Sequence, residues 1–451
     1  MSSRRKPHYP TKAALTRAFN AGHLLLGWKE IQPPSRPIGF HAVEADPASH
    51  PSSHRFEAEW TDNRESHSIC IAKTGSGKGR NSLIPQLLTW RGSAVVVDPK
   101  GEAAAVTGRF REQTLGQKVI YLDPFKVACK EPDTLNPLDV IQFSGDSPEE
   151  FALAAPGLLH PDHGGSLKDP FWDNNGDSLI SALTCYMLAC EPEEKRTFGR
   201  LRELLMSDDV VYNLAVLLDT MGKKMPAMAR ATIANFLSTA DVTRSGILST
   251  AQQHLRLIGD PNVERALGTT SFDLEAFRQG EPTTIYLILP VTRLQSHGLL
   301  LRCWLSTLFS VAMSRKKAPK TQTGFWVDEV AAIGALSQLS TAFTLLRGYG
   351  VKVSIYLQDL QQLKKLYPSD WETMVNNAGQ LQIFQPSNHF VARQLAELFG
   401  KDVQPEDILR LRHDEQILLR QGGDWTRCKK LDYLRDSCFQ GLYTPNPWYE
   451  P

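Results

Sequence analysis

The sequence lacks the features that would place it outside the ordinary globular class. Its seven cysteines are odd in number and include no CxxC pair, which indicates separate thiols in a reducing compartment rather than a disulfide framework. Neither sign of charge dominates, because 50 Lys and Arg residues stand against 49 Asp and Glu residues. Net charge therefore gives no support to nucleic-acid binding, and any basic contact surface has to be local.

Long hydrophobic runs are also missing. The most apolar stretch, residues 298–313, contains Arg302 and is shorter than the ~20 apolar residues of a membrane span. The amino-terminal Arg4, Arg5 and Lys6 are not followed by the apolar core of a secretion signal. We therefore expect a soluble chain that is located in the cytoplasm.

The 451 residues suggest about two or three domains. Residues 1–66 are rich in Pro, His and Ser and are predicted to be a loosely packed amino-terminal arm, and residues 426–451 to be a carboxyl-terminal tail. Strand and helix patterns alternate over 67–147 and 261–425, which predicts one α/β domain with a mostly parallel, doubly wound sheet. Residues 148–260 have helical periodicity without strand runs, so we expect an inserted all-α domain.

The strongest motif is a glycine-rich loop between a predicted strand at 68–72 and a predicted helix at 80–90. It consists of Thr74, Gly75, Ser76, Gly77, Lys78 and Gly79. Glycines let backbone N–H groups curl around phosphate oxygens, and the lysine can reach the terminal phosphates. The loop departs from the usual pattern at Ala72, which replaces the first glycine, and at Gly79, which replaces the Ser or Thr that binds Mg²⁺. Water, Thr74 or Ser76 are alternative ligands for that ion.

A second motif is the apolar run 324–327, which ends in Asp328 and Glu329. Paired acids at the end of a strand supply what nucleotide hydrolysis needs opposite a phosphate loop. Asp328 would hold Mg²⁺ through water, and Glu329 would polarise the attacking water. Acids are also common where helices begin, so the pair is informative only in combination with the loop.

Two polar residues flank the predicted strand 351–357. Gln358 follows it and is either a sensor of the terminal phosphate or a surface glutamine. Arg347 precedes it and is either a solvated loop residue or an arginine near the edge of the nucleotide crevice. The residues 98–102, Asp-Pro-Lys-Gly-Glu, end the predicted strand 93–98, and Pro and Gly suffice to make them a simple turn.

Together these motifs resemble the coupling ATPases of type IV secretion and conjugative DNA transfer. The resemblance covers about residues 68–412. In chain order it rests on residues 74–79, Ile84-Pro85, Gly92-Ser93, residues 98–102, Asp123-Pro124-Phe125, residues 136–139, residues 169–173, residues 244–250, residues 284–287, Asp328-Glu329, Tyr349-Gly350, Gln358 and Asn376-Asn377.

The resemblance implies a RecA-like P-loop NTPase domain with the helical domain inserted, acting as a hexamer around single-stranded DNA with ATP and Mg²⁺. It further implies that residues 74–79 bind the nucleotide, that Asp328 serves the metal, and that Glu329 and Gln358 are catalytic. Arg347 falls where such proteins place an arginine that reaches a neighbouring subunit's nucleotide. Family members normally begin with transmembrane helices, whereas no stretch of this sequence is apolar enough to be one. We therefore expect either a soluble branch or a separate membrane anchor protein that holds this chain at the inner membrane.

The predicted function is that of an ATPase that drives single-stranded DNA, bound to a relaxase, or an effector protein toward a type IV secretion channel. Two other interpretations stay open. One is a nucleotide-gated adaptor that docks its substrate through the helical domain and hydrolyses little ATP. The other is a DNA pump of the chromosome-segregation type, although the residues after Arg412 are few for the DNA-reading domain of such pumps.

Overall fold

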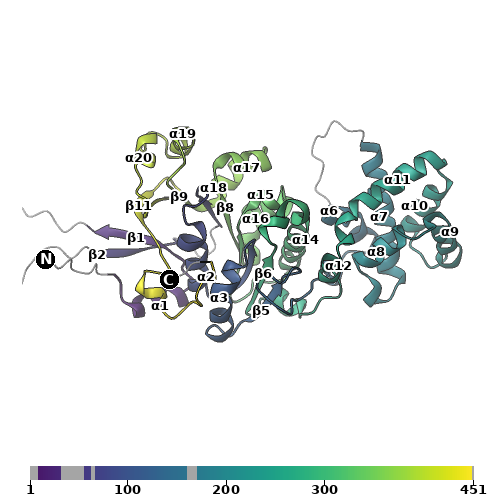
Figure 1. The fold of residues 1–451 in the computed structure, drawn as a ribbon, viewed down its shortest axis with the longest axis horizontal. Helices are drawn as coiled ribbons and strands as arrows, with labels where there is room; N and C mark the ends of the chain where they lie inside the picture. Colours follow the sequence, from purple (N-terminus) through teal and green to yellow (C-terminus); the bar gives the residue numbers. More distant parts are fainter. Residues whose placement is uncertain (1–8, 32–54, 62–66, 160–169, 449–451) are drawn as a thin grey trace, which may run out of the picture.

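A computed structural model describes residues 9–31, 55–61, 67–159 and 170–448. In these residues a large sheet is flanked by helices, and a further group of helices lies at one end (Figure 1). The strands are β1 (Leu25–Ile31), β2 (Arg55–Trp60), β3 (His67–Ile71), β4 (Ser93–Asp98), β5 (Lys118–Leu122), β6 (Thr283–Ile288), β7 (Thr323–Val327), β8 (Val351–Leu357), β9 (Ala378–Phe384), β10 (Glu415–Arg420) and β11 (Trp425–Lys430).

The helices of the sheet region are α1 (Lys12–Asn20), α2 (Ile84–Thr89), α3 (Glu102–Gln113), α14 (Leu294–Met313), α15 (Val330–Ile333), α16 (Ser337–Leu345), α17 (Leu360–Leu366), α18 (Trp371–Asn377), α19 (His389–Ala396) and α20 (Pro405–Leu409). Those between β5 and β6 are α4 (Ile141–Ser144), α5 (Pro148–Ala154), α6 (Pro156–Leu159), α7 (Pro170–Cys190), α8 (Phe198–Leu205), α9 (Val210–Met221), α10 (Ala227–Ser238), α11 (Asp241–His254), α12 (Pro261–Ala266) and α13 (Leu274–Gln279). A π-helical turn, Gly79–Leu83, leads into α2.

The sheet has two parts that differ in strand direction. Its order is β2-β1-β11-β10-β9-β3-β8-β7-β4-β6-β5. Neighbours from β9 to β5 pair in parallel, whereas β2, β1, β11, β10 and β9 pair antiparallel. This order confirms the predicted α/β class with a mostly parallel sheet.

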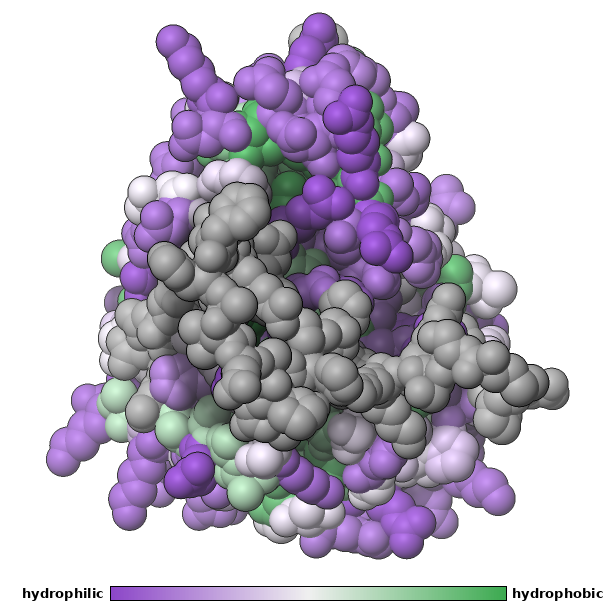
Figure 2. Space-filling view, turned by 90° about the vertical axis from the view of Figure 1, so that its left-hand side faces the viewer, coloured by the Kyte–Doolittle hydropathy of each residue, from purple (hydrophilic) through white to green (hydrophobic). Residues whose placement is uncertain are grey.

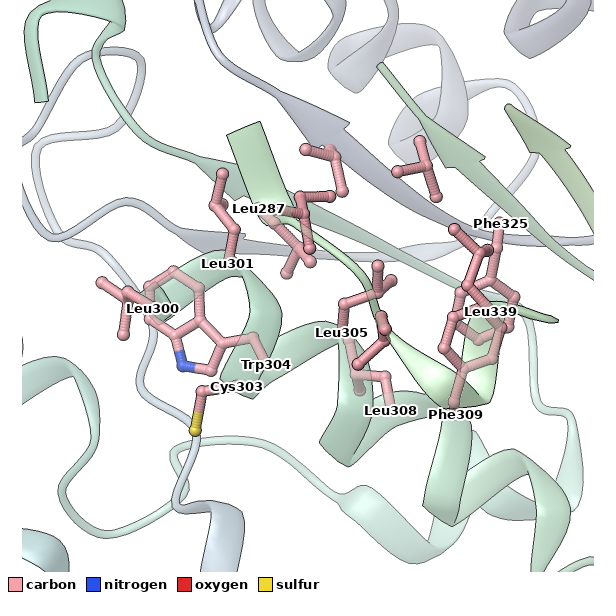
Figure 3. Packing of buried hydrophobic residues seen from close by; sticks show 14 of the residues in the cluster. Leu287, Leu300, Leu301, Cys303, Trp304, Leu305, Leu308, Phe309, Phe325 and Leu339 are labelled. Carbon is pink, nitrogen blue, oxygen red and sulfur yellow. The ribbon is translucent and has the colours of Figure 1, made fainter. Parts of the chain in front are cut away.

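Both faces of the parallel part are buried, because successive side chains of a strand point to opposite faces. Val95 belongs to one hydrophobic core and Val96 to another, which also contains Leu87 of α2. On the first face α14 packs directly against the sheet (Figure 3). Phe309 of α14 stacks on Phe325 of β7 with ring centroids 4.2 Å apart and an interplanar angle of 13°.

Helices alone follow β5 in the described residues, until the chain returns to the sheet at β6. α7 is the central helix of this group and packs against α5, α10 and α11. Its Leu183 and Met187 are fully buried. The group stands at the end of the molecule opposite to β1 and β2 (Figure 1).

None of the helices in the described ranges combines the length and the apolar character needed to cross a membrane. α14, which contains the most apolar stretch of the sequence, instead lies against the sheet. On the face that Figure 2 shows, the described residues are mainly hydrophilic, with smaller hydrophobic areas between them.

The predicted amino-terminal arm is wrong for residues 9–31 and 55–61, which are part of the packed fold. β1 pairs with both β2 and β11 and so extends the sheet. Trp28 is only 1% exposed, and its Nε1 donates to Asp436 Oδ2 at 2.8 Å. The Pro-rich and Ser-rich stretches at 33–37 and 47–54 lie outside the described residues.

The predicted carboxyl-terminal tail also belongs to the fold, as far as residue 448. β11 lies between β1 and β10 in the sheet. After it, Leu431, Tyr433 and Phe439 enter a core that is shared with α1, α2 and α3. The amino-terminal and carboxyl-terminal segments thus bury apolar side chains in one core, together with α2 and α3.

Replacing Trp28 by Ala tests whether the amino-terminal segment is integral to the fold. Loss of a buried Trp side chain typically costs about 3–5 kcal/mol, so we expect a clearly lower thermal unfolding temperature. Trp425→Ala is the matched control, because Trp425 lies in the neighbouring strand β11 and is 41% exposed. Equal shifts in differential scanning calorimetry would contradict a packed amino-terminal segment.

Candidate functional site

Four parallel strands end at the same edge of the sheet. Ile71 of β3 pairs with Leu357 of β8, and Val327 of β7 pairs with both Ile355 of β8 and Val97 of β4. The residues that follow these strands are therefore brought together. In open α/β sheets, ligands bind at this carboxyl edge.

The glycine-rich loop follows β3 and needs its glycines. Gly75 and Gly77 have φ angles of +77° and +88°, which side-chain-bearing residues adopt only at a cost. A Cβ at Gly77 would lie 2.0 Å from Asn81 Oδ1. Ser76 is 4% exposed, and its hydroxyl donates to the carbonyl of Lys73 at 2.6 Å.

Lys78 lies between the two acids that follow β7. Its Nζ is 3.9 Å from Asp328 Oδ1 and 3.8 Å from Glu329 Oε2. Gln358, at the end of β8, donates from Nε2 to Glu329 Oε1 at 3.2 Å. The structure thus brings together Lys78, Asp328, Glu329 and Gln358. Burial raises the pKa of Asp328, and the Lys78 ammonium opposes that rise.

Glu329 has a left-handed backbone, with φ 56° and ψ 54°. A residue other than glycine in this region is strained, and such strain gathers at functional sites. The conformation ends β7, and the Glu329 N–H donates to Asp328 Oδ1 at 3.0 Å. The strain adds a structural indication of function that the sequence pattern did not contain.

Residues 98–102, at the end of β4 and the start of α3, do more than form a simple turn. Asp98 is buried and accepts from the N–H of Ala104 at 2.8 Å, and burial raises its pKa to about 7. Glu102 begins α3 and accepts from Asn446 Nδ2 through Oε1 at 2.8 Å. Glu102 was not among the site residues predicted from the sequence.

The carboxyl-terminal segment also holds the phosphate loop in place. Lys430 Nζ donates to the Ser76 carbonyl at 2.9 Å. Arg80 forms two hydrogen bonds with Asp432, at 2.8 and 2.6 Å, and Asn81 Nδ2 donates to the carbonyl of Leu431. These contacts join residues about 350 positions apart, so no local sequence motif predicts them.

Arg347 is not near the crevice of its own chain, contrary to the position expected from the sequence. It precedes β8 and therefore lies at the edge of the sheet where the parallel strands begin, at the opposite end of β8 from Gln358. Its Nη2 donates to the carbonyl of Asn377 at 2.6 Å. Its charge acts on His67, the first residue of β3, where burial and then Arg347 lower the pKa to about 3.

Fold and site together define a phosphate-loop protein with a RecA-like core, in which β8 separates the loop strand β3 from the acid strand β7. Residues 46–403 match the family model described as Type IV secretory system Conjugative DNA transfer, and the chain belongs to this family. The match confirms the resemblance found in the sequence.

Two curated relatives illustrate the relationship. The chain is 25% identical over 409 residues to a probable conjugal transfer protein TraG of Sinorhizobium fredii, covering 82% of this chain and 62% of the relative. It is 24% identical over 431 residues to a protein VirD4 of Rhizobium radiobacter, with coverages of 86% and 60%. The chain thus spans about three-fifths of the length of these relatives.

Solved structures confirm the fold. The plasmid coupling protein TrwB in complex with the non-hydrolysable GTP analogue GDPNP superposes with a TM-score of 0.64 at 16% identity, covering 83% of this chain and 88% of the other. TrwB in complex with ADP and Mg²⁺ superposes with a TM-score of 0.63 at the same identity and coverage.

Proposed function

We propose that the protein hydrolyses ATP to drive a substrate into a type IV secretion channel. The observation that carries this proposal is the convergence of Lys78, Asp328, Glu329 and Gln358 at the carboxyl edge of the sheet. Membership of the family supports it. The relative TraG is a conjugal transfer protein, and the structural neighbour TrwB binds nucleotides, which supports it further.

Each of these side chains has a role that follows from its chemistry. Residues 74–79 enclose the phosphates. Lys78, which contacts Asp328 and Glu329 at 3.9 and 3.8 Å in this structure, pairs with the phosphate oxygens instead when the nucleotide is bound. The oxygen donors of Asp328 suit Mg²⁺, which neutralises charge on the phosphates when it is bound. Asp328 is partly desolvated, so a nearby cation is favourable for its ionised form.

Glu329 and Gln358 act on the attacking water. Glu329 accepts a proton from the water molecule while the water oxygen attacks the terminal phosphorus of ATP. The bond between that phosphorus and the bridging oxygen breaks, which leaves ADP and phosphate. The Gln358 amide holds one carboxylate oxygen of Glu329 by a hydrogen bond of 3.2 Å. That contact orients the carboxylate and places a phosphate-sensing amide beside it.

The substrates and partners follow from the family. We infer that the transported substrate is single-stranded DNA bound to a relaxase, or an effector protein, and that the protein works in the cytoplasm as a hexamer. The channel itself or a separate membrane anchor protein would recruit it to the inner membrane. Turnover that is stimulated by single-stranded DNA supports this motor, whereas tight ATP binding with near-zero turnover supports the nucleotide-gated adaptor, which Gly79 favours.

Lys78→Ala is the first test of the site. Loss of charge-assisted contacts with the phosphates should weaken ATP binding by at least about tenfold. Binding of a fluorescent ATP analogue measures the effect. Lys118→Ala, which removes an exposed lysine at the start of β5, serves as the control. Unchanged affinity of Lys78→Ala would refute the phosphate-loop assignment.

Glu329→Gln separates binding from hydrolysis. The variant keeps the size and the hydrogen-bond acceptor of the side chain, so ATP should still bind, but turnover should fall by on the order of 10²-fold because the general base is neutralised. Release of phosphate is the measurement, with the exposed Glu372→Gln as the control. Normal turnover would show that Glu329 only begins the helix α15.

Mixing two inactive variants tests Arg347. Because Arg347 lies at the opposite edge of the sheet from Lys78 in its own chain, it can serve only a neighbour's nucleotide. Arg347→Ala should bind ATP but lose turnover by about 10³-fold, by analogy with arginine fingers. Adding Lys78→Ala subunits, which carry an intact Arg347, should restore part of the activity.

Arg412→Ala, which removes an exposed arginine, is the control for that experiment. Failure to recover activity in particles shown to contain both variants would count against a role across the subunit interface. Full activity of Arg347→Ala alone would exclude a catalytic role altogether.

A further inference from the structure

Position 79 faces the carboxylate of Glu102. Gly79 has no positive φ, so a side chain is sterically allowed there. A Cβ built on it would lie 3.8 Å from Glu102 Oε2 and 4.0 Å from Oε1, with no third neighbour among the described residues within 4 Å. In phosphate loops generally, the residue at this position supplies the hydroxyl that binds Mg²⁺.

Glu102 is held in this position from two sides. It is the first residue of α3, directly after the left-handed Gly101. Asn446 Nδ2 donates to its Oε1 at 2.8 Å and also contacts the Tyr433 hydroxyl at 2.8 Å. Asn446 is itself 6% exposed. The oxygen closer to Gly79 is therefore Oε2, while Oε1 carries the contact with Asn446.

The hydroxyls of Ser76 and Thr74 in the loop do not occupy the position of the Mg²⁺-binding hydroxyl that Gly79 lacks. The Ser76 hydroxyl is buried and donates to the Lys73 carbonyl, and Thr74 lies exposed on the loop. The acids around the loop also act on one another, because burial, and after it the charges of Glu102 and Asp328, raise the pKa of Asp98. Concentrated negative charge at a phosphate site favours a bound divalent cation.

We propose that Glu102 replaces the hydroxyl missing at position 79 as a protein ligand of the nucleotide's Mg²⁺. This inference rests on the proposed function and specifies its metal site. Carboxylate oxygens are preferred ligands of Mg²⁺. A charged carboxylate binds the ion more strongly than a neutral hydroxyl does, and without the ion it repels the phosphates. Nucleotide binding should consequently depend strongly on Mg²⁺.

The test compares ADP affinity with Mg²⁺ and with EDTA, using a fluorescent ADP analogue and the full chain. The dissociation constant in EDTA divided by the dissociation constant with Mg²⁺ gives a ratio that reports the contribution of the metal. Glu102→Gln keeps the acceptor for Asn446 but removes the charge, so the ratio should fall by at least about tenfold, while affinity in EDTA stays equal or improves. Glu112→Gln, an exposed change at the other end of α3, should leave the ratio unchanged.

Two further variants make the assignment specific. Gly79→Ser combined with Glu102→Gln restores an oxygen at position 79 and should recover part of the ratio. No recovery would count against a shared ligand place. Asn446→Ala keeps the carboxylate but removes the hydrogen bond that positions it, so a smaller fall in the ratio is expected. This variant also keeps the test valid if Glu102→Gln does not fold.

The outcomes separate this inference from the proposed function. An unchanged ratio in Glu102→Gln, or in Asn446→Ala where the first variant does not fold, overturns the role of Glu102 and leaves the nucleotide site intact. Absence of ADP binding by the unaltered chain would instead contradict the proposed function. Electron paramagnetic resonance of Mn²⁺ in the presence of ADP gives an independent readout, and Glu102→Gln should bind the ion more weakly than the unaltered chain.

Discussion

Parallel pairing of β3, β8, β7 and β4 is the constraint on which the candidate site depends. It places the ends of four strands, taken from distant parts of the sequence, at one edge. Lys78, the adjacent pair Asp328 and Glu329, and Gln358 then meet although they come from three separate places in the sequence. A slip of one residue would turn every side chain of a strand to the other face, so the cores on both faces fix the register and thereby the site.

The phosphate loop is supported by residues about 350 positions further along the chain. Contacts from Lys430, Leu431 and Asp432 reach Ser76, Asn81 and Arg80. The same carboxyl-terminal segment closes a core with α1 and β1 from the other end of the chain. Packing of the two termini and the geometry of the site are therefore parts of one structure.

The sequence was informative where a motif and its neighbours lie close together. The loop 74–79, the acids at 328–329 and Gln358 could be identified from the strands next to them. Arg347 was misplaced because closeness to a strand in the sequence does not show at which edge of the sheet a residue lies. Arg347 precedes β8 and Gln358 follows it, and the seven residues of β8 between them span roughly 20 Å. The amino-terminal arm was mispredicted because one of the two strands that pair with β1 is β11, which is distant in the sequence. Glu102 was interpreted as part of a turn, since its closeness to Gly79 exists only in three dimensions.

The joining of the two ends has a consequence for how the chain matures on the ribosome. Synthesis proceeds from the amino terminus and domains form as they emerge. β1 has to wait for β11, and Arg80 waits for Asp432, which is 352 positions further along the chain. The nascent protein can form the local structure of its loop early, but the support around that loop is completed only when residues 430–432 have been added. Maturation of the phosphate site is thus timed to the synthesis of β11 and the residues that follow it, and a product that stops before them lacks part of the frame that holds the loop.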